Sequence, residues 1–351
     1  MSNQGPRIAI ITPYAAPVSV GGVEIFNEQL RQTFPDTDVF TDTGTAALWD
    51  WRRLGLDQPR RAVRAVREAV QRHRRDPYDV VVCNGLYGWP LALRGPGVPM
   101  VQVYHYTLAG LARNAIDHRG DKFATGTIAA FFDRLSGMGK RVVAVSQNVL
   151  SEVQRFYRLK GEVISNGVDT NRFLPGDKAR ARESFRLPSD APVGLYVGRP
   201  ERVKGFDVFL DVVRSMRDVL FLHVGSGSEA REANLRALGR VSHSAMPSVY
   251  RAADFYFLPS RYEGFNLSIL EALSCGLPIV VSEAAYPFSE GPEKYGKIVR
   301  SFAPSEFVRA IREVLSGLHS YQPRPVIEAN YSLAAFQARW RDVISRVALR
   351  G

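Results

Sequence analysis

Short apolar runs alternate with segments of helical periodicity along the whole chain. Most of the runs are continuous stretches rich in Val, Ile and Leu, which is typical of parallel strands covered on both faces. They predict strands at residues 7–11, 79–83, 100–104, 141–146, 162–165, 194–198, 219–225, 254–259, 278–282 and 297–300. Between them, the helical periodicity predicts helices at residues 22–34, 59–75, 147–157, 205–217, 246–253, 268–275, 304–316 and 334–349. Repeated strand–helix units predict an α/β protein with doubly wound parallel sheets.

The length of 351 residues exceeds one comfortable hydrophobic core, so two domains are expected. A polar stretch at residues 165–192, rich in Pro, Asp and Arg, is the expected seam. We therefore expect one Rossmann-like domain at residues 1–165 and a second at residues 166–333, with a terminal helix at 334–351 crossing back onto the first. Two such sheets facing each other make a cleft at the carboxyl ends of their strands, where open α/β sheets bind ligands.

The formal net charge of +11 comes mostly from Arg, and the densest cluster is residues 59–75. That segment has an apolar face of small side chains at helical spacing, namely Ala62, Val63, Val66, Ala69 and Val70. A basic amphipathic helix can lie on an anionic membrane. Ala and Val are poor membrane anchors, so a surface helix packed on its own sheet is favoured and peripheral membrane contact is not. No recognised motif supports nucleic acid as a partner.

The start of the chain lacks the pattern of a signal peptide, and no apolar run approaches the length of a membrane-spanning helix. Cys83 and Cys275 both lie within apolar segments. They are typical of reduced thiols in a protein core. Together these features predict a cytoplasmic protein.

Two cations follow a predicted strand in 196-YVGRPERVKGFD-207. Arg199 and Lys204 stand between the end of that strand and the start of a helix. Positive side chains at a strand's carboxyl edge, beside a helix N-terminus, suit a diphosphate. An ordinary solvated loop explains the same residues equally well at this point.

Glycines follow two other predicted strands. Gly21 and Gly22 open a helix after the first strand, and their amides could approach an anion, although a flexible turn is the more common reason for such a pair. Residues 224–230, VGSGSEA, match the Gly-rich dinucleotide fingerprint. No acidic residue follows about 20 positions later to hold a ribose, since position 245 is Ala, so a nicotinamide cofactor is excluded.

Two carboxylates stand in 260-SRYEGFNLSILEALSCGLPIVVS-282. Ser268 and Glu271 have the spacing of a capping box, which gives Glu271 a structural role to weigh against ribose binding. Glu263 lies in the loop before that helix and has no such role. A carboxylate can accept hydrogen bonds from both hydroxyls of a vicinal diol. The pair therefore suits a ligand that carries sugar rings.

The spacing from Glu263 to Glu271 resembles the E-x7-E signature of the retaining GT-B glycosyltransferases of family 4. Other segments fall in the order of that family, namely GGVE at 21–24, VSQNVLSEV at 145–153, NGVDTNRF at 166–173, GRPERVKGFD at 198–207 and GRVSHSAMPSVYRAADFYFLPSRYEG at 239–264. The resemblance implies the GT-B fold and the transfer of a sugar from a nucleotide-diphosphate donor to a hydroxyl acceptor, with retention of the anomeric configuration.

The resemblance also implies roles for particular residues. Arg199 and Lys204 would bind the donor diphosphate, Glu271 the ribose, and Glu263 would lie near the hydroxyls of the transferred sugar. His105, just past a predicted strand, would lie near the reaction centre. Backbone groups would complete the donor pocket: Gly21, Gly22, Phe265, Asn266 and Leu267 around the phosphates and sugar, and Arg240 and Val241 around the nucleobase.

Where the family usually has Gly-Leu-Pro, this chain has Asn266-Leu267-Ser268. The nucleotide sugar would be a co-substrate, and neither a separate cofactor nor a metal ion is expected, because the cations replace the metal. The nucleotide (UDP, GDP, ADP or dTDP) stays open, and so does the acceptor, which could be a small molecule, a lipid or a glycan. The alternatives are an epimerase or phosphorylase that acts on nucleotide sugars, or a non-catalytic binding homologue.

Overall fold

The structure of the protein is a computed structural model. It describes residues 5–13, 21–42, 57–92, 95, 97–227, 231–288, 291 and 294–349, so residues 228–230 of the VGSGSEA motif lie outside the described part, as do residues 14–20 before Gly21 and Gly22. Contacts divide the chain into two compact units. Unit 1 comprises Met1–Asn166 with Ala334–Gly351, and unit 2 comprises Gly167–Leu333.

Unit 1 is built on a parallel sheet of six strands in the order β2-β1-β3-β4-β5-β6. Their bounds are β1 Ile8–Ile11, β2 Thr37–Phe40, β3 Val80–Asn84, β4 Met100–Tyr104, β5 Arg141–Ala144 and β6 Glu162–Val163. The predicted parallel strands are confirmed. β2 was not predicted because it is a short edge strand with only Phe40 buried, so its polar sequence gives no apolar run.

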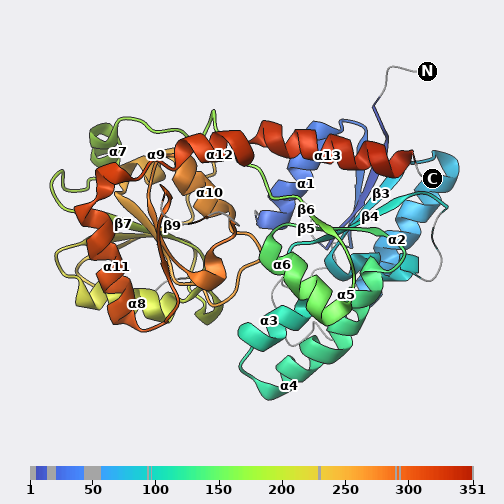
Figure 1. Ribbon diagram of the computed structural model, residues 1–351, viewed down its shortest axis with the longest axis horizontal. Helices are drawn as coiled ribbons and strands as arrows, with labels where there is room; N and C mark the ends of the chain where they lie inside the picture. Colours follow the sequence, from blue (N-terminus) through green and yellow to red (C-terminus); the bar gives the residue numbers. More distant parts are fainter. Residues whose placement is uncertain are drawn as a thin grey trace. The chain divides into compact units, whose positions relative to one another are not determined.

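Helices cover this sheet (Figure 1). They are α1 Gly22–Thr33, α2 Asp57–Arg75, the 3-10 helix η2 Gly85–Ala92, α3 Leu108–Asn114, α4 Arg119–Phe123, the π-helical turn η3 Ala124–Ala129, α5 Ala130–Gly137, α6 Gln147–Glu152 and the π-helical turn η4 Val153–Tyr157. The arginine-rich helix α2 buries Ala62, Ala65, Val66 and Ala69 within its own unit. The interpretation of residues 59–75 as a packed surface helix is therefore confirmed.

Unit 2 has a second parallel sheet of six strands, in the order β12-β11-β10-β7-β8-β9. The strands are β7 Val193–Val197, β8 Leu220–Val224, β9 Leu235–Gly239, β10 Phe255–Leu258, β11 Ile279–Ser282 and β12 Gly296–Val299. This is the strand order of the dinucleotide-binding fold. The second and third strands lie on one side of the first strand, and the fourth to sixth strands lie on its other side. The first and fourth strands are β7 and β10, so the switch point lies between them.

The helices of unit 2 are α7 Lys178–Ser184, the 3-10 turn η5 Arg202–Lys204, α8 Phe206–Ser215, α9 Met246–Ala252, α10 Leu267–Ser274, α11 Pro304–Ser316 and α12 Arg324–Asn330, with short 3-10 turns at η6 Glu283–Ala285 and η8 Leu318–Ser320. The two units divide between Asn166 and Gly167, at the start of the expected seam, and residues 167–192 belong to unit 2. Arg182 of α7 is buried and its guanidinium lies 2.6 Å from the carboxylate of Asp254. This polar segment is anchored by a buried ion pair, which apolar periodicity does not reveal.

The terminal helix α13, Leu333–Ala348, packs its apolar side on unit 1. Trp340 is fully buried, with its ring edge-on to Phe26 of α1 at a centroid distance of 5.5 Å. At the far end of the helix, Arg346 is 3.0 Å from Glu162 of β6, which also accepts a hydrogen bond from Arg141. The helix is thus held by an aromatic contact at its middle and an ion pair at its end.

Cys83 and Cys275 are both buried and free, the first in unit 1 and the second in unit 2. Within the described ranges, no helix is both long enough and apolar enough to span a bilayer.

Replacing Trp340 with Ala should lower the free energy of unfolding of unit 1 by about 3–5 kcal/mol, because it leaves a cavity against Phe26. Urea unfolding followed by circular dichroism measures the change. Leu349→Ala, at a side chain that is 87% exposed, is the control and should change stability little. An equal effect of the two substitutions would mean that α13 does not complete the core of unit 1.

Candidate functional site

The loop after β7 carries Arg199 and Lys204, and two buried side chains of the sheet hold its backbone. The hydroxyl of Tyr196 is shared between the carbonyl oxygens of Arg199, at 3.3 Å, and Lys204, at 3.1 Å. Nε2 of His223, on β8, lies 2.9 Å from the carbonyl oxygen of Gly198. Tyr196 and His223 of the sheet therefore fix the backbone that positions both cations.

Gly205 lets this loop approach the end of β10. It ends the 3-10 turn with a φ of +69°, and a Cβ there would collide with the carbonyl group of Pro259. Only glycine satisfies both conditions cheaply. Arg261, two residues past Pro259, then binds the carboxylate of Asp207 with both terminal nitrogens, at 2.6 and 2.8 Å. The loops after β7 and β10 are thus joined at the topological switch point, where open α/β sheets bind ligands.

Lys204 and Glu263 meet directly at this junction. The ammonium Nζ of Lys204 donates to both carboxylate oxygens of Glu263, at 2.7 and 2.9 Å. Oε1 of Glu263 also accepts from Ser260 Oγ, at 2.8 Å, and from Asn266 Nδ2, at 3.1 Å. The Glu263 side chain is only 9% exposed, so four donor contacts hold a nearly buried carboxylate in one orientation. Of these four contacts, Oε1 makes three and Oε2 makes only the one with Lys204.

Helix α10 begins differently from the capping box expected at Ser268. The N-cap is Asn266, whose Oδ1 accepts the amide of Ser268 at 2.9 Å, while Ser268 itself lies in the first turn. Asn266 therefore has two functions, because its oxygen caps the helix and its nitrogen holds Glu263. The capping role of Glu271 is wrong, since its Oε2 instead accepts the hydroxyl of the buried Tyr250 at 2.6 Å. Burial raises the pKa of Glu271 to about 7.

The remaining expected donor-site residues of unit 2 surround the same strand ends. Arg199 is 33% exposed and pairs with Glu201 at 2.6 Å. Arg240 and Val241 follow β9, with Arg240 exposed. Phe265 is nearly buried and Leu267 is half-buried at the start of α10. Each lies after the carboxyl end of a strand of the same sheet.

In unit 1, His105 follows β4 and ends a chain of buried polar contacts. Its Nε2 lies 3.0 Å from Asn84 Oδ1, Asn84 Nδ2 donates to Asn27 Oδ1 at 2.8 Å, and Asn27 Nδ2 donates to Thr12 Oγ1 at 3.2 Å. Because Asn84 already donates through its nitrogen, its oxygen must accept, so Nε2 of His105 carries the proton. Burial lowers the pKa of His105 to about 3, so the ring is neutral with an acceptor at Nδ1.

Gly21 and Gly22 start α1, which follows β1 in the same unit. Gly21 is the N-cap in an extended conformation, and Gly22 is the first helical residue. A Cβ on Gly21 would lie 2.8 Å from Oε2 of Glu24. Gly21, Gly22 and His105 thus all follow the carboxyl ends of unit 1 strands.

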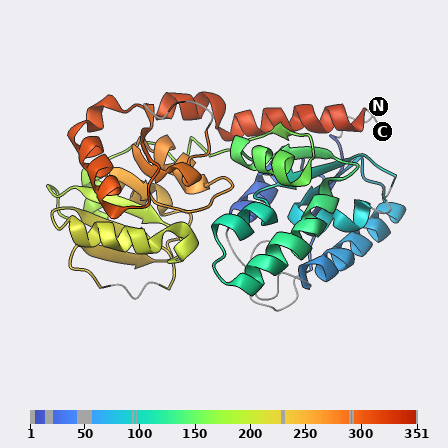
Figure 2. The ribbon, with the colours of Figure 1, turned by 60° about the horizontal axis from the view of Figure 1, so that its bottom comes forward.

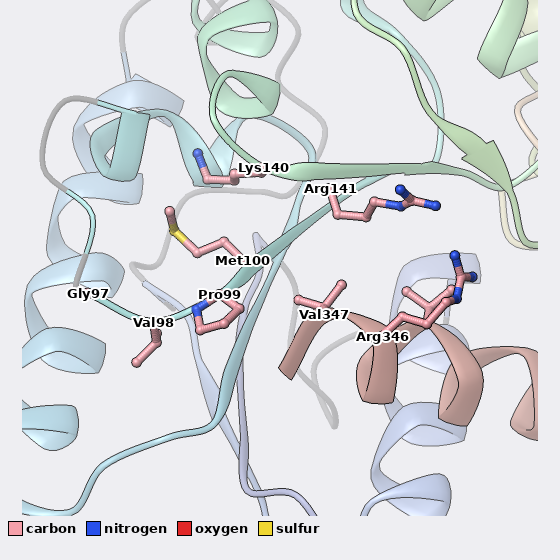
Figure 3. A pocket seen from close by; sticks show the side chains of 9 residues that line it. Gly97, Val98, Pro99, Met100, Lys140, Arg141, Arg346 and Val347 are labelled. Atoms are coloured by element: carbon pink, nitrogen blue, oxygen red, sulfur yellow. The ribbon is translucent and has the colours of Figure 1, made fainter. Parts of the chain in front are cut away.

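A cavity of about 490 Å³ lies at the opposite edge of this sheet. Its lining includes Met100 at the start of β4 and Arg141 at the start of β5, as well as Arg346 and Val347 of α13. Figure 3 shows Arg141 beside the α13 side chains, and both arginines already pair with Glu162. His105 lies at the carboxyl ends of the strands, so this cavity is separate from the expected site.

No group of three or more His, Cys, Asp or Glu side chains that could hold a metal ion occurs in the described part of the chain. The site of unit 2 brings together the cations Arg199 and Lys204 and the fixed carboxylate of Glu263. Cations beside a fixed carboxylate suit a ligand that has a phosphate part and a hydroxyl-rich part.

Comparison with known proteins identifies the family. The family description "Glycosyltransferase Family 4" matches residues 20–172, and "Glycosyl transferases group 1" matches residues 191–317. The chain is 30% identical to D-inositol 3-phosphate glycosyltransferase 2 of Catenulispora acidiphila, over 99% of this chain and 96% of that protein. The chain therefore belongs to the family 4, group 1 glycosyltransferases and is a glycosyltransferase.

Solved structures show the same GT-B fold. Sucrose-phosphate synthase from Thermosynechococcus elongatus has a TM-score of 0.83 at 19% identity, covering 99% of this chain and 100% of that chain. HepE from Anabaena, solved in complex with UDP-glucose, has a TM-score of 0.73 at 17% identity, covering 97% of this chain and 100% of that chain. The expected GT-B fold is confirmed.

Several residues of the site escaped the sequence-based prediction. Tyr196 and His223 lie inside apolar strands, where they are indistinguishable from packing residues. Arg261 and Asp207 are 54 residues apart in the chain, so their pairing leaves no local signal. Asn84 stands directly after a predicted strand, and a polar residue at that position was the one available indication of the His105 network.

We predict that the His105 ring stays neutral from pH 8 down to about pH 4, with its single proton on Nε2. Nitrogen-15 NMR of the ring measures both properties. The folded pKa lies below the ordinary value of 6.5, so the unfolded chain binds a proton that the folded chain does not. The stability that the folded protein gains from keeping the His105 ring neutral is therefore complete above pH 6.5, and it is lost as the pH falls towards 3. His105→Gln should therefore lose less stability than the wild type between pH 7 and pH 4, and a ring that titrates near pH 6.5 contradicts this.

Proposed function

We propose that the protein transfers a sugar from a nucleotide-diphosphate donor to a hydroxyl acceptor with retention of the anomeric configuration. The observation that carries this proposal is the Lys204–Glu263 pair at the switch point of unit 2, with Arg199 in the same loop. A diphosphate attracts the two cations, and the fixed carboxylate accepts hydroxyl groups of the sugar. Family membership supports the same assignment.

In the proposed reaction, the bond between the anomeric carbon and the leaving phosphate oxygen breaks while a bond to the acceptor oxygen forms on the same face. The proton of the acceptor hydroxyl moves to the leaving phosphate. Arg199 and Lys204 stabilise the negative charge that grows on the diphosphate, and amides at helix N-termini add to this. Fixed donors are effective here because they need no reorganisation during the reaction. The nucleotide sugar is a co-substrate, and no metal ion takes part.

Other residues take supporting roles in this proposal. Glu271 accepts the ribose hydroxyls, and backbone around Arg240 and Val241 borders the nucleobase. Phe265, Asn266 and Leu267 line the sugar and phosphate pocket, and Gly21 and Gly22 offer their amides. Neutral His105 accepts or orients a hydroxyl through Nδ1, because its Nε2–H is already held by Asn84. The enzyme is expected to act in the cytoplasm.

The test of the function begins with thermal unfolding in the presence of UDP, GDP, ADP and dTDP, because a ligand that binds only the folded protein raises its melting temperature. The matching nucleotide sugar is then supplied with candidate acceptors. The name of the Catenulispora relative makes inositol 3-phosphate the first acceptor to test. NMR of the product distinguishes retention from inversion. An epimerase or phosphorylase would act without the acceptor, and a binding homologue would not turn over.

Arg199→Ala and Lys204→Ala should each weaken binding of the preferred nucleotide diphosphate by about tenfold or more, because each removes a charge-assisted contact. Glu263→Gln should bind it as tightly as the wild type or more tightly, since Lys204 loses a competing carboxylate, but should lose turnover. Calorimetry and a product assay measure these effects. Arg214→Ala, on α8 and paired with Glu232, is the matched control and should change neither. Turnover by Glu263→Gln near the wild-type rate contradicts the role of Glu263.

The wild-type enzyme should bind the nucleotide more tightly than Glu271→Gln at pH 8 and about equally at pH 6. The folded pKa of Glu271 is raised to about 7, so the acid is protonated at pH 6, where it resembles glutamine, and ionised at pH 8, where it accepts both ribose hydroxyls. The expected ratio at pH 8 is about tenfold. Titration of the ligand phosphate changes the affinity of both proteins equally, so it cancels in the ratio of the two affinities. A ratio that does not change with pH excludes Glu271 from ribose binding.

A further inference from the structure

Helices α4, η3 and α5 form one continuous helical run from Arg119 to Gly137, which Figure 2 shows from the side that carries α4. Its inner face is anchored in unit 1. The buried Asp133 accepts the hydroxyl of Tyr157 at 2.6 Å and the amide of Leu108 at 3.1 Å. Phe132 packs edge-on to Trp89 of η2 at a centroid distance of 4.8 Å. The run is therefore held firmly on one side.

The outer face of the same run carries large apolar side chains. Phe123 is 67% exposed, Phe131 56%, Met138 45% and Ile128 40%. The other large apolar side chains with comparable exposure in the described chain are Leu174, Phe302 and Leu349, which are scattered over both units. Single exposed apolar residues are ordinary, but a cluster marks an interaction surface.

The π-helical turn brings these side chains into line. In a π-helical turn, hydrogen bonds close from residue i to residue i+5, so Ile128 follows Phe123 on nearly the same side of the helix. Phe131 comes three residues after Ile128, which is an α-helical spacing along one face, and Met138 is the C-cap that directly follows the run. A regular α-helix would turn Phe123 well away from Ile128. The local geometry thus assembles a surface that the sequence alone does not show.

Cations border this apolar face. Arg119, Lys122 and Arg134 are exposed on the same run. Of the acids in the run, Asp133 is buried, and Asp121 is half-buried and lies 3.5 Å from His118. A helix that exposes aromatic and aliphatic side chains beside cations has the composition of a segment that lies in the interface of an anionic membrane. A second copy of this chain fits less well, because a two-fold contact would place the same cations against each other.

We propose that the outer face of residues 119–138 docks onto an anionic lipid surface, with Phe123, Ile128, Phe131 and Met138 entering the apolar region and Arg119, Lys122 and Arg134 meeting the headgroups. The arginine-rich helix α2, which the charge pattern singles out, does not serve this purpose, because its apolar side is buried in unit 1. The proposal is independent of the identity of the donor and the acceptor.

The test is co-sedimentation of the full chain with vesicles of phosphatidylcholine alone or mixed equally with phosphatidylglycerol, at low and at physiological salt. The wild type should pellet with the anionic vesicles, less at higher salt, and little with phosphatidylcholine. The double substitution Phe123→Ser with Phe131→Ser should weaken this binding at least about tenfold, because two large apolar side chains no longer enter the membrane. Lys122→Glu should weaken it several-fold and only on anionic vesicles.

Two variants serve as controls. Leu349→Ser removes an exposed apolar side chain elsewhere on unit 1, and Arg67→Gln removes an exposed cation of α2. Both should pellet like the wild type. Thermal unfolding checks that the double variant is folded, and Phe123→Ser alone, at the most exposed of the four positions, replaces it if the double variant melts early.

Three results would overturn the proposal. These are a wild-type protein that does not pellet with anionic vesicles, a double variant that pellets as well as the wild type, or vesicle binding lost in Arg67→Gln but kept in the double variant. Analytical ultracentrifugation tests the alternative that a second copy of the chain binds this face. Self-association that the double variant abolishes, without vesicle binding by the wild type, would assign the face to a second copy of the chain.

Discussion

The ion pair between Lys204 and Glu263 is the interaction that joins the two loops of the proposed donor site. A nearly buried carboxylate is costly unless its charge is paired and its oxygens are hydrogen-bonded, and Lys204, Ser260 and Asn266 meet both conditions. Removing either partner would leave an uncompensated charge at the end of the sheet. The pair therefore fixes the distance between the loop after β7 and the loop after β10.

The surrounding contacts serve to hold this pair in place. Tyr196 and His223 fix the carbonyl groups of the first loop, while Arg261 clamps the second loop to Asp207. Gly205 permits the close approach of the two segments. The site is thus organised before a ligand arrives, and a phosphate group would meet cations whose backbone positions are already set. Preorganisation of this kind is what lets charged groups stabilise a transition state.

In unit 1, neutral side chains hold one residue, His105, in a fixed orientation. Its strand ends carry a chain of asparagine and threonine side chains that fixes the tautomer of His105, and burial keeps that ring uncharged. The two units therefore present different chemistry at equivalent edges of similar sheets. One offers fixed charges, and the other offers an oriented hydrogen-bond acceptor. This difference fits the proposed reaction, in which negative charge grows on the donor diphosphate while His105 orients a substrate hydroxyl group.

The sequence by itself determined the parallel sheets, most of their strands and the residues that follow the strand ends, because apolar runs and strand-end polar residues are local patterns. It also singled out Arg199, Lys204, Glu263 and Glu271. Only the tertiary structure decided that Asn266 caps α10, that Glu271 pairs with Tyr250, and that residues 119–138 expose an apolar face. Those outcomes depend on partners distant in the chain and on a π-helical turn, and neither has a periodicity that can be read along the sequence.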